Sequence, residues 1–173
     1  MEEQDFQRRT GKVMIIAGWV LVLGLLTFYF SDFLADQHNP NQLLETAQTA
    51  NAKEVRLERN RFGHYVATGS INDSPVTFLL DTGATQISIP ANIAKRLQLK
   101  AGIAVPVMTA NGQIDVYMTR LNRVSLGDIE VRDVRANINP YMDTDEILLG
   151  MSFLKHLDFS QQGNELIIRQ VNN

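Results

Sequence analysis

The sequence predicts a mostly β, barrel-like domain with two short helices, preceded by one transmembrane helix. Short segments of alternating apolar and polar residues follow one another from residue 54 to the C-terminus, separated by turn signals such as Asn111-Gly112. An uncharged and almost wholly apolar run over residues 13–30 precedes them. The chain of 173 residues contains no cysteine, which excludes disulfides, thiolate catalysis and cysteine-ligated zinc.

The composition argues against two broad classes of protein. Apolar residues make up 45% of the chain and charged residues 20%, so we expect a hydrophobic core rather than disorder. The formal net charge is −3, and no basic cluster in the second half is dense enough to follow a phosphate backbone. We therefore expect no nucleic acid among the partners.

The apolar run over residues 13–30 has the length of a membrane-spanning helix. As a helix it would extend about 27 Å, close to the thickness of a hydrocarbon core. Arg8, Arg9 and Lys12 precede it, and no Lys or Arg follows until Lys53. The positive-inside rule then places residues 1–12 in the cytoplasm and the rest of the chain on the other side of the membrane.

Two other interpretations of this run are open. A buried core helix is disfavoured because the run has no polar face. A cleaved signal peptide would have a similar basic start and apolar middle, but this run is longer than a typical signal core. No small-x-small cleavage pattern follows it either. We therefore favour an uncleaved anchor.

Residues 31–53 are interpreted as a stalk. They are rich in Asn, Gln, Ala and Thr and show no strand pattern. Residues 41–52 could form a weak helix with Leu43, Leu44 and Ala47 on one side. The remaining residues, 54–173, would form the folded outer domain.

The outer domain is predicted to consist of short strands and two short helices. Turn residues over 72–75 join the second and third strands, and Pro90 is well placed to open a helix. The first half is predicted to contain a first strand around Val55 and Leu57, further strands over residues 64–71, 76–80 and 86–89, and a helix over 91–97. The second half is predicted to contain strands over residues 105–109, 114–120, 124–126, 129–138, 147–149 and 166–169, with a helix-like stretch after Gly150.

The candidate site is Asp81-Thr82-Gly83-Ala84, which directly follows the apolar Phe78-Leu79-Leu80. This order places a carboxyl group on a tight loop at the end of a buried strand. Because burial of an ionised carboxylate is costly, such a group indicates a function. A turn-forming aspartate that caps its own loop is the plain alternative.

Peptide hydrolysis by carboxyl groups alone requires two of them, one ionised and one protonated. The chain has one Asp-Thr-Gly, and its later aspartates lack the apolar lead-in: Asp115, Asp128, Asp133, Asp143, Asp145 and Asp158. Two copies related by a two-fold axis would place Asp81 beside its own mate. We therefore expect a homodimer.

The stretch over residues 78–90 (FLLDTGATQISIP), with Ile147-Leu148-Leu149-Gly150 much later, resembles a retropepsin-like, single-lobe aspartic protease. Its closest resemblance is to the membrane-anchored bacterial members. This resemblance implies a closed β-barrel of the acid protease fold and an aspartic endopeptidase activity. It also implies a single-pass protein of the inner membrane, with the protease domain in the periplasm.

The resemblance implies roles for the residues of the loop. Asp81 would be catalytic, Thr82 would hydrogen-bond across the two-fold axis, and Gly83 would let the substrate backbone approach. Ala84 would contact substrate. Leu148, Leu149 and Gly150 match the second signature of the family, which supports the active loop.

The family's flap, a β-hairpin that closes over the bound peptide, would correspond to residues 106–119. Its tip would lie at Ala110, Asn111 and Gly112, which would contact the substrate. A plain surface hairpin is the alternative at this position. The family also interleaves terminal strands at the dimer interface, for which residues 166–169 are the candidate.

These observations predict an endopeptidase that activates a water molecule with the Asp81 pair and cleaves polypeptide without a cofactor. His38, His64 and His156 are scattered without ligand spacing, so no metal site is expected. The main alternative is a non-catalytic module of the cell envelope that binds peptides or only dimerises.

Overall fold

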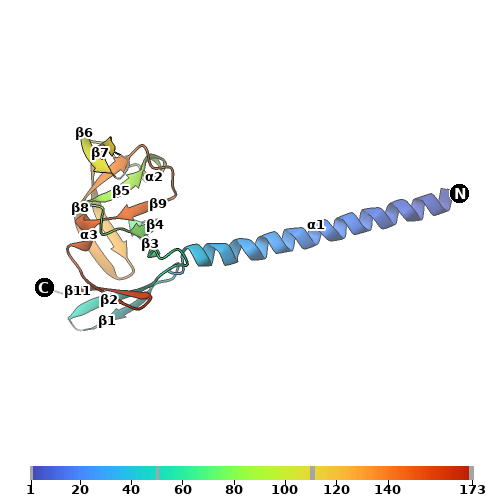
Figure 1. Ribbon diagram of the computed structural model, residues 1–173, viewed down its shortest axis with the longest axis horizontal. Coiled ribbons are helices and arrows are strands. Elements are labelled where there is room, and N and C mark those ends of the chain that lie inside the picture. The colour runs from blue at the N-terminus through green and yellow to red at the C-terminus, as the bar shows by residue number, and fades with distance from the viewer. Residues whose placement is uncertain (1, 50, 110–111, 172–173) are drawn as a thin grey trace. The chain divides into compact units, whose positions relative to one another are not determined.

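The computed structural model describes residues 2–49, 51–109 and 112–171. The chain divides into two compact units, with the boundary after Gln37. The first unit consists of the helix α1 (Glu2–His38), which is labelled in Figure 1. Only the last residue of this helix, His38, belongs to the second unit. Within the described ranges, α1 is the one helix that is long and apolar enough to cross a membrane by length and composition.

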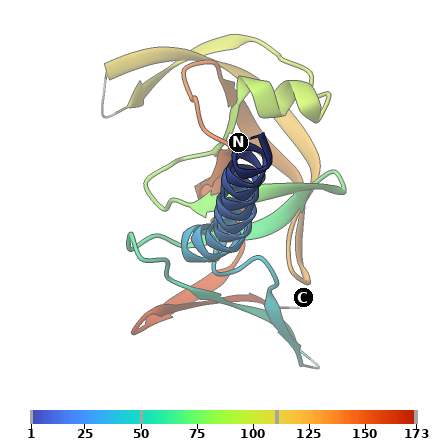
Figure 2. The ribbon, with the colours of Figure 1, turned by 90° about the vertical axis from the view of Figure 1, so that its right-hand side faces the viewer.

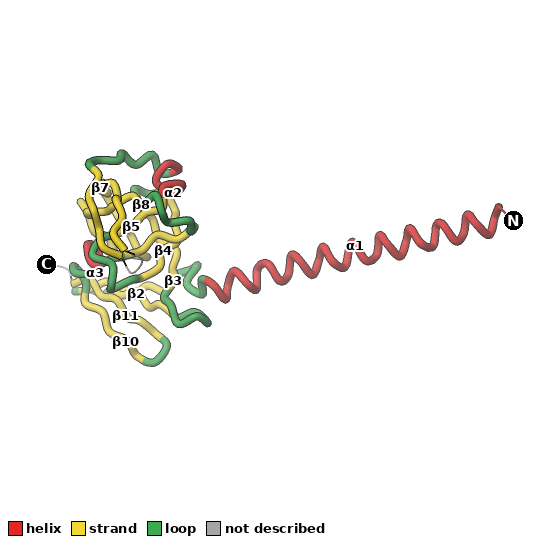
Figure 3. The backbone as a smooth tube through the Cα atoms, turned by 45° about the horizontal axis from the view of Figure 1, so that its top comes forward, coloured by secondary structure: helices red, strands yellow, loops and turns green. Residues whose placement is uncertain are grey.

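The second unit is built almost entirely of strands (Figure 3). A seven-stranded sheet has the order β3-β4-β9-β5-β8-β7-β6, and a further pairing of β3 with β7 closes it into a barrel. Its strands are β3 (Val66–Ile71), β4 (Ser74–Leu80), β5 (Ile87–Pro90), β6 (Ala104–Thr109), β7 (Gly112–Leu126), β8 (Ile129–Asn139) and β9 (Glu146–Leu149). The predicted mostly β, barrel-like fold is confirmed.

A second sheet of four strands has the order β1-β2-β11-β10. Its strands are β1 (Glu45–Gln48), β2 (Ala52–Glu58), β10 (Asp158–Gln162) and β11 (Glu165–Val171), and in Figure 2 they gather at the lower end of the unit. The strand β11 pairs with β2 on one side and with β10 on the other. Both of its edges are therefore occupied within the chain, and residues 166–169 have no free edge with which to interleave.

Two short helices complete the unit. The helix α2 (Ala91–Arg96) starts directly after Pro90, as predicted, because a proline at a helix start loses no helical hydrogen bond. The helix α3 (Met151–Leu154) follows Gly150 at the end of β9. Phe153 and Leu154 of α3 are buried in the barrel core.

The hairpin β3–β4 turns more tightly than its sequence indicates. Ile71 pairs with Ser74, so the turn contains only Asn72 and Asp73, with φ angles of 47° and 69°. Asn and Asp tolerate this left-handed conformation, which matches the twist of the two strands. Pro75, expected in the turn, lies instead within β4 and pairs with Ser70.

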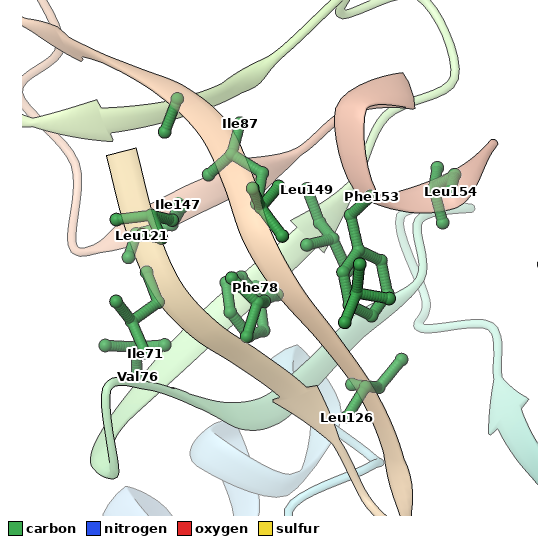
Figure 4. Close-up of a cluster of buried hydrophobic side chains, with 14 of the residues drawn as sticks. Ile71, Val76, Phe78, Ile87, Leu121, Leu126, Ile147, Leu149, Phe153 and Leu154 are labelled. Carbon is green, nitrogen blue, oxygen red and sulfur yellow. The ribbon is translucent and has the colours of Figure 1, made fainter. Parts of the chain in front are cut away.

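The core of the barrel fixes the strand that leads to the candidate site. Phe78 of β4 is fully buried and lies at the centre of the cluster in Figure 4. Gly69 makes room for its ring, because a Cβ atom on Gly69 would lie 2.6 Å from Phe78 Cε2. Burial of a phenylalanine stabilises the fold by about 2–3 kcal/mol, so the register of β4 is well determined.

The segment interpreted as a stalk is largely folded into the second unit. The predicted helix over residues 41–52 is wrong, because β1 pairs there with β2, and the compact unit begins at His38 rather than at residue 54. Asn41 is buried and donates from Nδ2 to the carbonyl oxygens of Glu58 (2.9 Å) and Val66 (2.7 Å). Its Oδ1 accepts from the Glu58 amide at 2.7 Å. Polar residues that suggested a solvated linker therefore satisfy buried backbone groups.

Candidate active site

Asp81 stands at the carboxyl end of β4, where the sequence places it. The strand β4 runs parallel to β9, with Leu80 opposite Leu149, and the Asp81 amide donates to the Leu149 carbonyl at 3.2 Å. Asp81 is half-buried, whereas Thr82 and Gly83 are exposed. The carboxyl group thus sits on a firmly paired strand end beside two residues that face solvent.

The Asp81 side chain also organises its own loop. The Gly83 amide donates to Asp81 Oδ1 at 2.8 Å, and the Ala84 amide donates to the Asp81 carbonyl at 3.2 Å. The first bond forms an Asx turn, which orients the carboxylate, and the second closes a β-turn of the main chain. A Cβ atom on Gly83 would lie 3.1 Å from Asp81 Oδ1, so this position favours glycine.

Gly150, the glycine of the second predicted signature, lies against the backbone of this loop. A Cβ atom on Gly150 would lie 2.4 Å from the Gln86 carbonyl oxygen and 2.6 Å from that of Ala84. The Met151 amide donates to the Ala84 carbonyl at 2.8 Å. The start of α3 is therefore in backbone contact with the loop that follows Asp81, and only glycine permits this approach. Leu149 is buried beside it, and Leu148 is half-buried.

The sequence analysis missed one residue that holds this loop. Ser152 Oγ accepts a hydrogen bond from the Ile87 amide at 3.0 Å, where β5 begins. A serine in a short helix carries no local signal for this contact, because its partner lies far away in the sequence. Ser152 thus fixes the far end of the segment that starts at Asp81.

A pocket opens beside the exposed side of the loop. It has a volume of about 370 Å³ and is lined by Tyr65, Leu80, Thr82, Leu154, Phe159, Gln161 and Leu166. The Tyr65 hydroxyl is buried and has no hydrogen-bond partner within the described residues. Most of the lining side chains are apolar, so the pocket exposes apolar surface next to Thr82.

The predicted flap is a regular hairpin. The strands β6 and β7 pair from Ala104 opposite Tyr117 to Thr109 opposite Gly112. Gly112 has a φ of 111°, a conformation that favours glycine, and Thr109 Oγ1 donates to its carbonyl oxygen at 2.7 Å. The other two residues of the predicted tip, Ala110 and Asn111, lie outside the described residues.

Comparison with known proteins agrees with this geometry. The family described as "gag-polyprotein putative aspartyl protease" matches residues 67–156, which include the Asp81 loop and Gly150. The crystal structure of a retropepsin-like aspartic protease from Rickettsia conorii has 28% sequence identity and a TM-score of 0.59. It matches 75% of this chain and 96% of that chain. The chain belongs to the retropepsin-like, single-lobe aspartic protease family.

Two bacterial proteins are similar to this retropepsin-like chain. An uncharacterized protein from the cobV 5' region of a Sinorhizobium species is 30% identical over 167 residues, which cover 89% of this chain and 72% of that protein. An uncharacterized protein of Rickettsia prowazekii (strain Madrid E) is 27% identical over 118 residues. That match covers 66% of this chain and 50% of the relative, so the chain spans half of the relative's length.

Proposed function

We propose that this chain is an aspartic endopeptidase in which Asp81 is the catalytic acid. The observation that carries the proposal is the placement of Asp81. In a chain of this family, its half-buried carboxyl group ends a core strand and is oriented by the Gly83 amide. A carboxyl group held in this way is oriented before substrate arrives, which lowers the cost of reaching the reactive geometry.

The proposed active unit is a homodimer, because the chain contains a single Asp-Thr-Gly. A two-fold axis beside the loop would bring Asp81 next to the partner's Asp81 and would let the two Thr82 residues stiffen the paired loops. Gly83 would leave room for the substrate backbone. Each subunit would thus contribute half of the site.

In aspartic proteases two adjacent carboxyl groups share one proton, and the proposed mechanism assumes the same for the Asp81 pair. The ionised carboxylate takes a proton from a water molecule, whose oxygen attacks the carbonyl carbon of the scissile bond. The protonated carboxyl group gives its proton to the carbonyl oxygen. As the C–N bond breaks, the carboxyl group that took the proton from water passes it to the leaving amine, and a hydroxyl group of the tetrahedral species returns its proton to the other carboxylate.

The proposed substrate is a polypeptide in extended conformation. The β6–β7 hairpin would act as the flap, with Ala110, Asn111 and Gly112 near the peptide and Ala84 on the opposite side. A lid of this kind excludes water and orders the substrate. Backbone hydrogen bonds of the strand-addition type would provide most of the affinity.

The proposed location is a membrane, with residues 13–30 as a single anchor and the protease domain on the periplasmic side of the inner membrane. The length and composition of α1 support the anchor. The basic residues before it support a cytoplasmic N-terminus. Confinement to a bilayer would raise the effective concentration of the subunits and favour pairing.

A non-catalytic module that binds peptides or only dimerises is the second candidate. The bond between the Gly83 amide and Asp81 Oδ1 is compatible with this candidate as well, because a turn-forming aspartate makes the same bond without any catalysis. This candidate keeps the fold and the pairing but assigns no chemistry to Asp81.

The test compares the full chain with its Asp81→Asn variant in detergent micelles, using a mixed peptide library from acidic to neutral pH. We expect the parent to cleave and the variant to lose more than about 1,000-fold in rate, since removal of a catalytic group costs this much or more. Asp128→Asn, a change of the same kind at an exposed hairpin turn, serves as the control and should cleave normally. An inactive parent, or an Asp81→Asn variant with parental activity, would overturn the proposal.

A further inference from the structure

The loop between β2 and β3, residues 59–65 (RNRFGHY), adjoins the end of α1. His38 is the last residue of α1 and the first residue of the second unit. Its carbonyl oxygen accepts a hydrogen bond of 3.0 Å from Asn60 Nδ2, and Asn60 is buried. The loop is therefore bonded to the residue at which α1 ends.

The same asparagine gives the loop a fixed shape. Its Oδ1 accepts hydrogen bonds from the amides of Phe62 and His64, both at 3.0 Å. The Gly63 amide donates to the Asn60 carbonyl oxygen at 3.0 Å, and the Asn60 amide donates to the His64 carbonyl oxygen at 2.8 Å. Gly63 has a φ of 87°, a conformation that favours glycine. A loop bonded in this way is ordered before any partner binds, which lowers the entropic cost of binding.

The loop presents an aromatic ring and positive charge to solvent. Phe62 is 57% exposed, and the Arg61 guanidinium lies 4.6 Å from the centroid of its ring. Arg59 is exposed as well. Residues 59–65 contain no Asp or Glu, and Glu58, directly before them, lines a separate hollow with two other glutamates. The exposed surface of the loop is therefore basic and aromatic.

We propose that this loop docks on a membrane surface that carries anionic headgroups, beside the point where α1 leaves the bilayer. The inference goes beyond the proposed function and rests on its membrane anchor. An aromatic ring next to a cation suits the boundary between hydrocarbon and water, because the ring enters the headgroup layer while the guanidinium contacts phosphates. The planar guanidinium binds two phosphate oxygens at once, which makes Arg61 a suitable headgroup ligand.

The length of α1 places the loop within reach of the headgroups. His38 lies eight residues after Phe30, the end of the apolar run, which corresponds to about 12 Å of helix. The headgroup layer extends about 5–8 Å beyond the hydrocarbon core on each side. The end of α1 would therefore stand only a little outside this layer. The side chains of Arg61 and Phe62 can cross that gap, and they do so more easily where α1 is tilted.

The segment that follows α1 is held by several elements of the second unit. His38 Nε2 lies 2.5 Å from Glu146 Oε1 at the start of β9, and Asn39 Nδ2 donates to Thr68 Oγ1 of β3 at 3.1 Å. The chain thus enters the second unit at a firmly bonded point next to the loop. Docking of the loop would add a second attachment to the covalent one and hold the second unit in one orientation over the bilayer.

Tryptophan fluorescence tests the contact, because the chain has a single tryptophan, Trp19. The full chain with Trp19→Phe and Asp81→Asn is placed in nanodiscs of phosphatidylcholine and phosphatidylglycerol in equal parts, with brominated acyl chains as the quencher. In this background we expect the fluorescence of Phe62→Trp to be quenched strongly, because an aromatic ring at position 62 would reach the acyl boundary.

Val171→Trp in the same background is the matched control. Val171 is exposed and pairs with Ala52, at the opposite end of β2 from Glu58. Six residue steps along β2, about 20 Å, separate it from the loop. Quenching of Phe62→Trp no greater than that of Val171→Trp would overturn the inference. Shielding of Phe62→Trp from aqueous iodide without quenching by the lipid would overturn it too, because a protein would then cover the loop.

A second variant pair measures the contribution of charge. Arg61→Gln, added to Phe62→Trp, should lower the ratio of docked to undocked chains about fivefold, because each basic residue near an anionic surface is attracted to it. Arg96→Gln, the same change at an exposed position of α2, should leave this ratio unchanged. Equal ratios in the two variants would overturn the inference, since the loop would then not recognise headgroup charge.

The docking of the loop and the proposed function fail separately. If the parent cleaves peptides but Phe62→Trp is not quenched above the control, the docking is wrong and the protease assignment stands. If Phe62→Trp is quenched as expected but the parent cleaves no peptide, the docking stands and the proposed function fails. A chain that does not enter nanodiscs at all would refute the anchor and the docking together.

Discussion

The Met151 amide donates a hydrogen bond of 2.8 Å to the carbonyl oxygen of Ala84, and so joins the first residue of α3 to the loop that begins at Asp81. Gly150, directly before Met151, allows this contact because it has no side chain. The position of the candidate catalytic loop therefore depends on residues almost seventy positions later in the chain, and this dependence can be tested.

Gly150→Ala should displace the loop. The new Cβ would lie within 2.6 Å of two carbonyl oxygens, those of Gln86 and Ala84, and backbone atoms cannot rotate away. We expect a loss of about 1–3 kcal/mol in the free energy of unfolding and a large loss of cleavage rate, measured by urea denaturation and peptide assay. Gly24→Ala, at a position with open space, should change neither quantity. Unchanged stability of Gly150→Ala would contradict this packing.

Ser152→Ala should loosen the far end of the loop. It removes the acceptor for the buried Ile87 amide, which costs about 1–3 kcal/mol of unfolding free energy. If Ser152 positions Asp81, kcat should fall while KM stays nearly constant, and Ser152→Thr should restore part of kcat. Ser74→Ala, the same change at the first residue of β4, is the control. A fall in stability with kcat unchanged would assign Ser152 a purely structural role.

Asn41→Ala should destabilise the second unit strongly. Asn41 is 4% exposed, and its side chain donates two hydrogen bonds and accepts one. The substitution removes all three. With backbone groups of β2 and β3 left unsatisfied, we expect a loss of about 3 kcal/mol or more. Asn122→Ala at an exposed position should lose less than about 0.5 kcal/mol in the same denaturation experiment. Similar losses in the two variants would be inconsistent with a buried network.

Glu54 should make stability depend on pH in the acid range. A hydrogen bond from Arg169, at 2.6 Å, together with a second from Arg56, lowers the pKa of the Glu54 carboxyl below its ordinary value of 4.5. A lowered folded-state pKa contributes stability that is complete above the unfolded pKa and is lost as the pH falls through the folded pKa.

The parent should therefore be more stable than Glu54→Gln at neutral pH, and the difference should vanish well below pH 4.5. Thermal unfolding of both proteins over this pH range measures the difference. Asp145→Asn, at an exposed loop position before β9, should follow the pH dependence of the parent. A difference between parent and Glu54→Gln that is constant with pH would contradict the ion pairs.

The parts of the fold that could be predicted have local signals. Alternation of apolar residues marked β4 and most of the barrel, and Pro90 marked the start of α2, because side-chain burial and backbone geometry act there within a few residues. Asp81 was singled out because it follows a short apolar strand, whereas Gly150 was singled out through the resemblance to the family's second signature.

The parts that were missed are held by distant partners. The strand β1 (ETAQ) and the strand β10 (DFSQQ) are short and mostly polar, and they form because β2 and β11 offer their edges. Ser152 and Asn41 stabilise the fold through hydrogen bonds to backbone groups that are far away in the sequence. The β3–β4 turn contains two residues, Asn72 and Asp73, rather than the four that were predicted. The twist of the two strands favours the shorter turn, and a pattern of residue types does not encode that twist.

The buried asparagine at position 41 bears on how proteolysis could separate the second unit from the helix α1. Proteases cut chains that lie open and extended, whereas Asn41 and the residues Glu45–Gln48 are hydrogen-bonded to neighbouring strands. Proteolysis at Asn41 or within Glu45–Gln48 would first require local unfolding of these residues. Where opening and closing are fast relative to cleavage, the rate of cleavage at these residues would then be proportional to the population of the open form.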